Sequence, residues 1–197
     1  MHLTSVGGAR LCAPHALRSP SAAAITPAFL AALDGALRRA DRLRLGQLPL
    51  LALQNAPAGF DPDAEALATG SASRRSALRL WLLPSGALAR GICINALRTD
   101  AASLADPAGL AQVRLAAALQ RLEGRVAALV TCGWIARDAA ARLYGLQHRP
   151  QWNATARAGG LPFTAIPHPS GRNSLNNPGG PGRQSHEVVR PLLLAQP

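Results

Sequence analysis

Lysine is absent from this chain, and acidic residues are few. All 21 basic side chains among the 197 residues are arginine, against 10 acidic residues, so the net charge is +11 and the pI is about 11.6. Because the forked guanidinium group binds phosphate well, this excess favours a polyanionic partner. The use of arginine instead of lysine also fits GC-rich coding, since Ala, Gly and Pro are abundant. The net excess of basic charge is therefore the more informative of the two observations.

Cysteine is scarce as well, and its spacing argues against a cysteine-based metal site. Cys12, Cys93 and Cys132 lie far apart, and no two have the short spacing of zinc or iron–sulfur ligands. We therefore expect no metal and no cofactor. Unpaired, widely separated cysteines fit a reducing compartment, and we expect a cytoplasmic protein.

No apolar run is long enough to span a bilayer. The best early segment, 22–33, is short and is interrupted by Pro27, so we expect no membrane partner. The hydrophobic content of 48% and the mean hydropathy of +0.08 exclude a wholly disordered chain. A length of 197 residues suits one domain, and we expect a monomer.

Both ends of the chain are expected to lie outside the folded domain. We expect residues 1–25 to form a flexible N-terminal extension, residues 26–180 one α/β domain, and residues 181–197 a C-terminal tail. The leader also has the composition of an organellar transit peptide, with Arg10 and Arg18, several serines and no acid before Asp34. Both interpretations of the leader stay open.

Short apolar segments alternate with stretches of helical periodicity along the chain. Strands are predicted over 48–53, 91–95, 126–132 and 161–166, and helices over 26–45, 74–83, 110–122 and 134–146. Residues 171–183 are rich in Gly, Pro and Asn, and they predict irregular structure. Because parallel strands need crossovers that are usually helices, the pattern predicts a three-layer α/β/α fold with a central four-stranded parallel sheet.

Polar residues follow the predicted strands at the points where they end. In a sheet of this kind the ligand crevice lies beyond the carboxyl ends of the strands. These ends carry Asn55, Asn95, Gly133 and His168. Three polar side chains able to hydrogen-bond a base are therefore expected to emerge at one edge of the sheet.

The last of these strand ends carries a specific motif. Residues 165–173 read Ala-Ile-Pro-His-Pro-Ser-Gly-Arg-Asn. This segment resembles the second conserved motif of the uracil-DNA glycosylase superfamily, in which a strand ends in His-Pro-Ser followed by Gly, Pro or a similar residue. The wider pattern over 126–177 looks like a prophage and bacterial branch whose motif is extended to His-Pro-Ser-Gly-Arg-Asn. The order of elements agrees over 48–177.

The resemblance implies an activity and assigns roles to three residues. It implies a DNA glycosylase that hydrolyses the N-glycosidic bond of uracil or a related damaged base after the base is flipped out of the DNA. His168 then donates a hydrogen bond to the departing base. Residues 54–58 resemble the first motif, which implies that Asn55 holds the attacking water. Residues 92–97 resemble the strand whose final Asn reads the pyrimidine edge, which implies that Asn95 sets specificity.

The same resemblance implies DNA contacts around the His168 motif. Ser170 and Gly171 are expected to offer backbone N–H groups to a phosphate, and Arg172 a charge-assisted contact. Asn173 belongs to the same DNA-binding segment, and Leu175 is the candidate for the apolar wedge that family members insert into the stack.

Relatives also stack an aromatic side chain on the flipped base, about ten residues after the first-motif proline. Residues 65–69 contain no aromatic, so Phe60 is the candidate substitute. Trp81, Trp134 and Trp152 are instead expected to anchor the core or loops.

Two other interpretations compete with the glycosylase. Asn55 is an amide and has no useful basicity near neutral pH, so the chain is alternatively a catalytically weak or inactive DNA-binding protein of the same fold. Fold class alone also admits a hydrolase of free nucleosides or nucleotides. Nucleophilic hydrolysis by Ser170 is disfavoured, because no Gly-x-Ser-x-Gly elbow is present.

Overall fold

The computed structural model describes residues 25–55, 60–67, 69–98, 104–158, 161–170 and 173–194, with only the backbone of Asn55 and Ala158. The helices are α1 (Pro27–Arg42), α2 (Ala72–Leu80), α3 (Pro107–Arg121), α4 (Trp134–Leu143) and α5 (Ser185–Leu194). The strands are β1 (Leu48–Asn55), β2 (Ile92–Leu97), β3 (Val126–Cys132), β4 (Thr155–Ala158) and β5 (Leu161–Ile166). Short 3-10 turns lie at η1 (Ala87–Arg90), η3 (Ser174–Asn176) and η4 (Pro181–Gln184).

The strands form one mixed sheet in the order β2-β1-β3-β5-β4. β1 is parallel to β2 and to β3, and β3 is parallel to β5. The α/β class and the four predicted parallel strands are confirmed. The fifth strand, β4, pairs antiparallel with β5 at the sheet edge and was not expected. A four-residue edge strand is too short to give a clear alternation of apolar and polar residues.

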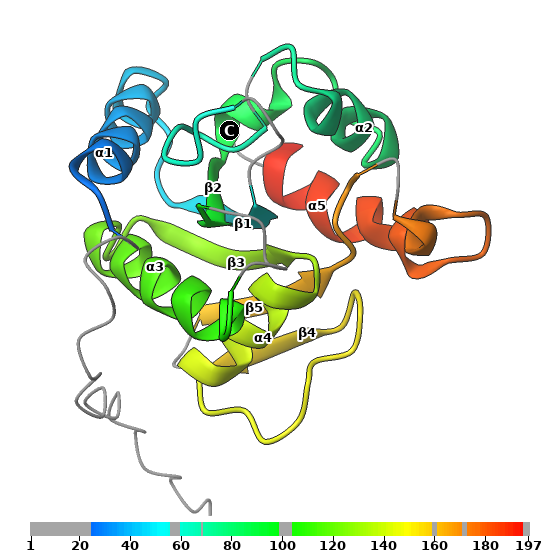
Figure 1. Ribbon diagram of the computed structural model, residues 1–197. Coiled ribbons are helices and arrows are strands. Elements are labelled where there is room, and N and C mark those ends of the chain that lie inside the picture. The colour runs from blue at the N-terminus through cyan, green and yellow to red at the C-terminus, as the bar shows by residue number, and fades with distance from the viewer. Residues whose placement is uncertain are drawn as a thin grey trace, which may run out of the picture.

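Helices cover both faces of the sheet and complete three layers (Figure 1). One face packs against α1, α3 and α4, whose buried residues include Phe29, Leu115 and Ala140. The other face packs against α2 and α5, through side chains such as Trp81 and Leu193. In the part of the chain that is described, no helix is long and apolar enough to cross a membrane.

Three helices begin at residues that cap them with a side-chain oxygen. Thr26 accepts a hydrogen bond from the Phe29 N–H at 3.1 Å, and Ser71 accepts one from Arg74 at the same distance. Asp106 accepts one from Gly109, also at 3.1 Å. These oxygens satisfy N–H groups that lack a partner within the helix, which is why the chain turns into helix at these points.

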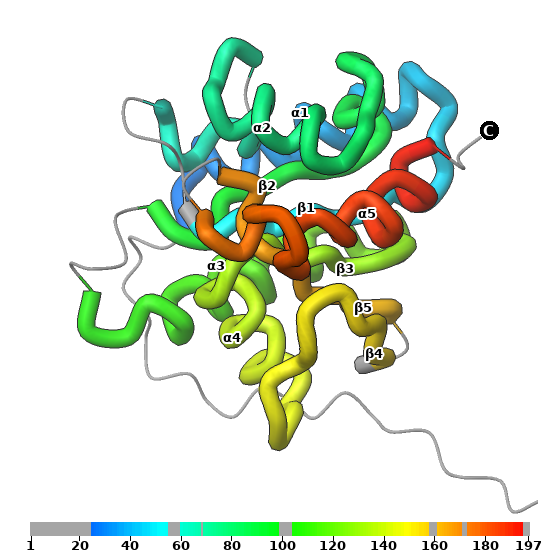
Figure 2. Tube along the Cα trace, turned by 90° about the vertical axis from the view of Figure 1, so that its right-hand side faces the viewer, coloured from blue at the N-terminus to red at the C-terminus, as the bar shows by residue number. Residues whose placement is uncertain are grey.

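The C-terminal segment differs from the expected tail. Residues 185–194 form α5, and Val189 and Leu193 are buried against the sheet and α2. Figure 2 shows α5 lying along the side of the molecule that faces the viewer. The tail prediction is wrong because apolar residues at helical spacing find a sheet face to cover. The 3-10 turns η3 and η4 likewise interrupt the segment expected to be irregular. The predicted N-terminal extension lies outside the described residues, apart from residue 25.

Candidate functional site at the carboxyl edge of the sheet

Strand register brings Asn95 and the His168 turn to the same edge of the sheet. Leu53 pairs with both Asn95 and Cys132, and Cys132 pairs with Ile166, so these side chains share one face. His168 follows Ile166 by two residues, just beyond the end of β5. β1 and β3 lie between β2 and β5, which separates the two backbones by about 14 Å.

His168 is a neutral imidazole whose ring proton lies on Nε2. The Ser170 N–H donates a hydrogen bond to His168 Nδ1 at 3.2 Å. Nδ1 is therefore an acceptor, and the ring proton lies on Nε2. Burial lowers the pKa of His168 from 6.5 to about 4, so the ring is uncharged near neutral pH. Nε2 is itself buried, and it has no hydrogen-bond partner among the described residues.

Two asparagine side chains fix the turn that carries this imidazole. Asn173 Nδ2 and Asn176 Nδ2 each donate to the carbonyl oxygen of His168 at 3.0 Å. Asn176 Nδ2 also lies 2.8 Å from the carbonyl oxygen of Ser170. The Asn173 carbonyl oxygen Oδ1 accepts from the Leu175 N–H at 3.1 Å. The turn is therefore held from two sides before any ligand binds.

Several polar groups of the expected DNA-binding segment are hydrogen-bonded within the turn. The Ser170 N–H, expected to meet a phosphate, is bonded to His168, and the Asn173 amide is bonded within the turn. Leu175 is half-buried in η3. Gly171 and Arg172 lie outside the described residues. Asn176 was missed by sequence reasoning, although the Asn-rich run 173–177 was the available signal.

On β2, the side-chain oxygen of Asn95 has no hydrogen-bond partner among the residues that the structure describes. Its side chain is 3% exposed, and Nδ2 donates to the carbonyl oxygen of Pro62 at 3.3 Å. Turning the amide over would point its oxygen at that carbonyl, so the bond fixes the orientation. The Asn95 oxygen Oδ1 is buried without a hydrogen-bond partner in the described structure.

A buried arginine holds the Asn95 strand end and the neighbouring loop together. Arg114 Nε donates to the backbone oxygen of Asn95 at 2.7 Å, and Nη2 donates to that of Pro62 at 2.9 Å. Nη1 pairs with Asp63 at 2.9 Å, and the guanidinium lies 3.7 Å from the centre of the Phe29 ring. Sequence reasoning missed Arg114 and Asp63, because no local pattern links them.

Asp63 collects further partners that keep it ionised. Thr26 Oγ1 donates to it at 2.8 Å, and Arg98 Nη2 lies 3.2 Å away. Burial by itself raises the pKa of Asp63, but the hydrogen bonds from Thr26 and Arg114 outweigh burial and hold this pKa below its usual value. The loop next to Asn95 is therefore tied to α1 and α3.

Gly133 allows three strand ends to approach closely. Its φ of +103° is a conformation that L side chains rarely adopt. A Cβ at this position would lie 2.9 Å from Gln54 Oε1 and 3.3 Å from His168 Cβ. The ends of β1, β3 and β5 thus meet at Gly133. Gln54 belongs to the first-motif segment, where the sequence favoured its neighbour Asn55, whose side chain lies outside the described residues.

Phe60 is positioned close to the Asn95 loop. Its side chain is 38% exposed, and it precedes Pro62, the residue whose carbonyl binds Asn95, by two positions. An exposed aromatic ring is therefore available near this strand end. Its stacking on a base stays a prediction.

Other chemistry finds little support in the described residues. They contain no group of three His, Cys, Asp or Glu side chains able to hold a metal ion. Burial raises the pKa of both Cys93 and Cys132, so neither is a ready nucleophile. Within the described part of the chain, three further buried polar atoms lack partners, on Trp81, Thr131 and Asn176. An unpaired atom alone therefore does not mark a site, and the location at the strand ends is what distinguishes His168 and Asn95.

Fold and site together define a three-layer α/β protein with a polar site at the carboxyl edge of its sheet. A comparison with protein-family models, with curated proteins and with solved structures found no match for this chain.

Proposed function

We propose that this protein is a DNA glycosylase that hydrolyses the N-glycosidic bond of uracil or a related damaged base after the base has been flipped out of the stack. One observation carries the proposal. A buried donor, His168 Nε2–H, and a buried acceptor, Asn95 Oδ1, both lack partners among the described residues and lie at the same edge of the sheet. Buried polar atoms cost free energy unless a partner satisfies them, and a flipped base supplies such partners.

The protonation state of His168 suits a departing base. Cleavage leaves positive character on the sugar and negative charge on the base oxygen, and a donor aimed at that oxygen stabilises the transition state. A neutral imidazole with its proton on Nε2 donates to that oxygen without having to be charged first. The pKa of about 4 keeps it in this form over the whole neutral range.

Asn95 supplies the discrimination between bases. Its oxygen accepts from a ring N–H, which uracil presents between its two carbonyls. Cytosine has a bare ring nitrogen at that position, so two acceptors would face each other in a buried site. A site that leaves buried polar groups unpaired disfavours the wrong base strongly. Arg114 and Pro62 hold Asn95 in the orientation that this selection requires.

Hydrolysis also needs a residue that holds the attacking water in place. Asn55 is the proposed water-holding residue, and an amide orients water by hydrogen bonds without acting as a base. Gln54, which reaches Gly133 at the same strand end, is also an amide. We therefore expect a slow enzyme. For the same reason the second candidate function is a catalytically weak or inactive DNA-binding protein of this fold.

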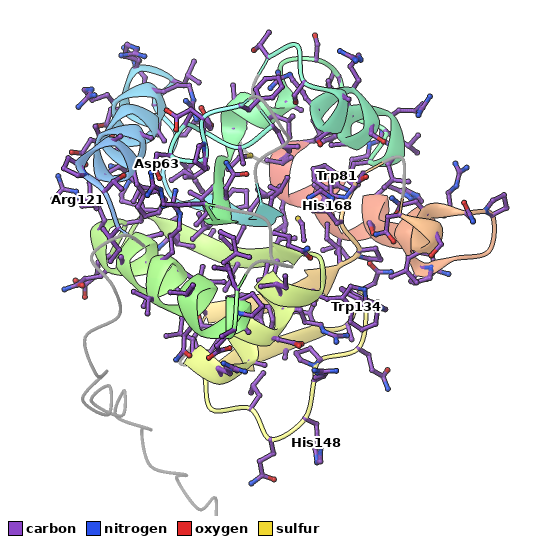
Figure 3. All side chains as sticks on the ribbon, viewed as in Figure 1. Asp63, Trp81, Arg121, Trp134, His148 and His168 are labelled. Atoms are coloured by element: carbon purple, nitrogen blue, oxygen red, sulfur yellow. The ribbon has the colours of Figure 1, made fainter. Side chains whose placement is uncertain are left out.

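The test is base release from uracil-containing oligonucleotides, single-stranded and double-stranded, scored as alkali-labile sites. We expect cleavage by the wild type and a loss of roughly 100-fold or more in His168→Ala, as for removal of an oxyanion donor. His148→Ala is the matched control, since this exposed histidine lies in the loop between α4 and β4, far from His168 (Figure 3). Salt-dependent DNA binding with no release of uracil, of other damaged pyrimidines or of hypoxanthine would favour the second candidate.

A further inference from the structure

Trp134 is a large aromatic side chain that the fold leaves half-exposed beside the candidate site. It is 49% exposed and is the first residue of α4. It directly follows Gly133, the residue that approaches His168. Figure 3 shows Trp134 and His168 on the same side of the molecule. Of the tryptophans expected to be anchors, Trp81 is fully buried, whereas Trp134 presents much of its ring to solvent.

Two neighbours hold the Trp134 ring in place. Trp152 meets it edge-on, with ring centres 4.9 Å apart and planes at 79°. The guanidinium of Arg137 lies 4.4 Å from the centre of the Trp134 ring and 4.5 Å from that of Trp152. Arg137 is itself 5% exposed. A ring already immobilised in this way loses little conformational entropy when a ligand stacks on it.

The sheet fixes this aromatic pair relative to His168. Trp152 forms a parallel bridge with Ala165, and the Asn153 N–H donates to the Ala165 carbonyl oxygen at 2.8 Å. Ala165 belongs to β5 and precedes His168 by three residues. Trp152, which meets the Trp134 ring, is therefore bonded to the strand that ends just before His168.

The surroundings of Trp134 are charged and favour a polyanion. Arg137 and Arg149 both pair with the carboxylate of Asp138, at 3.4 Å and 2.9 Å, so the trio is positively charged overall. The Arg149 side chain is 69% exposed. Protein partners dock on larger contiguous apolar patches, whereas a single exposed ring beside guanidinium groups suits a base with its phosphates.

We propose that Trp134 is a stacking platform for an unpaired base of single-stranded DNA, adjacent to the base held by His168 and Asn95. The proposal rests on the proposed function for its choice of DNA and extends it by naming the strand form. Bases inside a duplex already stack on their neighbours and offer no free face. A single strand offers one at every nucleotide, and every base has such a face.

The experiment measures binding of undamaged oligothymidylate and of a duplex containing the same strand. Without any base release, we expect the single strand to bind more tightly and to quench tryptophan fluorescence. Trp134→Ala should weaken single-strand binding by roughly 5- to 100-fold. Trp134→Tyr, which keeps a stacking ring, should restore most of the affinity, and Trp134→Phe should abolish most of the quenching. A circular dichroism spectrum and a melting curve confirm that each variant folds.

Leu43→Ala is the matched control. Leu43 is 50% exposed and lies at the end of α1 before β1, at the opposite edge of the sheet from Trp134. Its loss should leave binding unchanged. Equal affinity of Trp134→Ala and wild type, a preference for the duplex, or tighter binding of the corresponding RNA strand would each overturn the proposal. Binding that depends on Trp134 in a protein that releases no base would uphold the platform and reject the glycosylase.

Discussion

The backbone N–H of Ser170 donates to Nδ1 of His168 at 3.2 Å, and this single bond decides which imidazole nitrogen carries the proton. Two residues of one motif thus set the chemistry of the site between them. The only ring N–H of His168 is then on Nε2, which is buried and has no hydrogen-bond partner among the described residues. Four predictions test this arrangement and the fold that supports it.

The first prediction concerns the pH dependence of stability. Burial lowers the pKa of His168 to about 4, so the native protein binds this proton less readily than the unfolded chain. The stabilisation is therefore complete above about pH 6.5 and is lost as pH falls toward 4, by ~3 kcal/mol. Urea unfolding at several pH values should show this decline in the wild type and a smaller one in His168→Gln. The same slope in both variants, with His148→Gln as control, would contradict the assignment.

The second prediction concerns Gly133. Gly133→Ala forces a Cβ against Gln54 and His168 at a positive φ, so the free energy of unfolding should fall by roughly 2 to 4 kcal/mol. Gly145→Ala separates the two causes, because Gly145 has a φ of +63° but open space where the added methyl group would lie. It should cost about 1 kcal/mol. Per folded molecule, base release should fall in Gly133→Ala alone, and equal losses in both variants would refute the close approach.

The third prediction concerns the buried Arg114. Arg114→Met leaves the Asp63 carboxylate short of a partner and removes the donors to Asn95 and Pro62, so we expect a loss of about 3 to 5 kcal/mol. Adding Asp63→Leu should recover part of this loss, because the unpaired charge disappears. Arg121→Met is the control, since Arg121 lies at the surface (Figure 3) and its ion pair with Asp34 is exposed, so its loss should change the free energy of unfolding little. Additive losses in the double variant would argue against the coupling.

The fourth prediction concerns α5. Leu193 is fully buried between α5 and the sheet, so Leu193→Ala should lower the free energy of unfolding by about 2 to 5 kcal/mol. Leu192→Ala, one position away and only partly buried, is the comparison and should cost less. Chemical denaturation measures both. A negligible effect of Leu193→Ala would mean that the helix does not belong to the folded core.

The sequence predicted the main elements because their signals are local. Apolar runs bounded by glycine, proline and asparagine marked the four parallel strands, and apolar residues at helical spacing marked α1 to α4. The caps at Ser71 and Asp106 start α2 and α3 at Ala72 and Pro107, ahead of the predicted starts at 74 and 110. β4 and α5 were missed. The first is only four residues long. The second has apolar residues at helical spacing, but it contains Pro191, which disfavours the prediction of a helix.

Parallel topology also allowed part of the site to be predicted, because strands running the same way bring their carboxyl ends to one edge of the sheet. Asn95 and His168 were expected there from their positions alone. Their states were decided by partners distant in the chain or by burial. Pro62 and Arg114 orient Asn95, burial keeps His168 neutral, and Trp152 holds Trp134 at the surface. The sequence by itself therefore determined which polar groups reach the edge of the sheet. Tertiary packing alone decided which of their atoms have no partner among the described residues, because desolvation and long-range hydrogen bonds exist only after the helices have packed on both faces of the sheet.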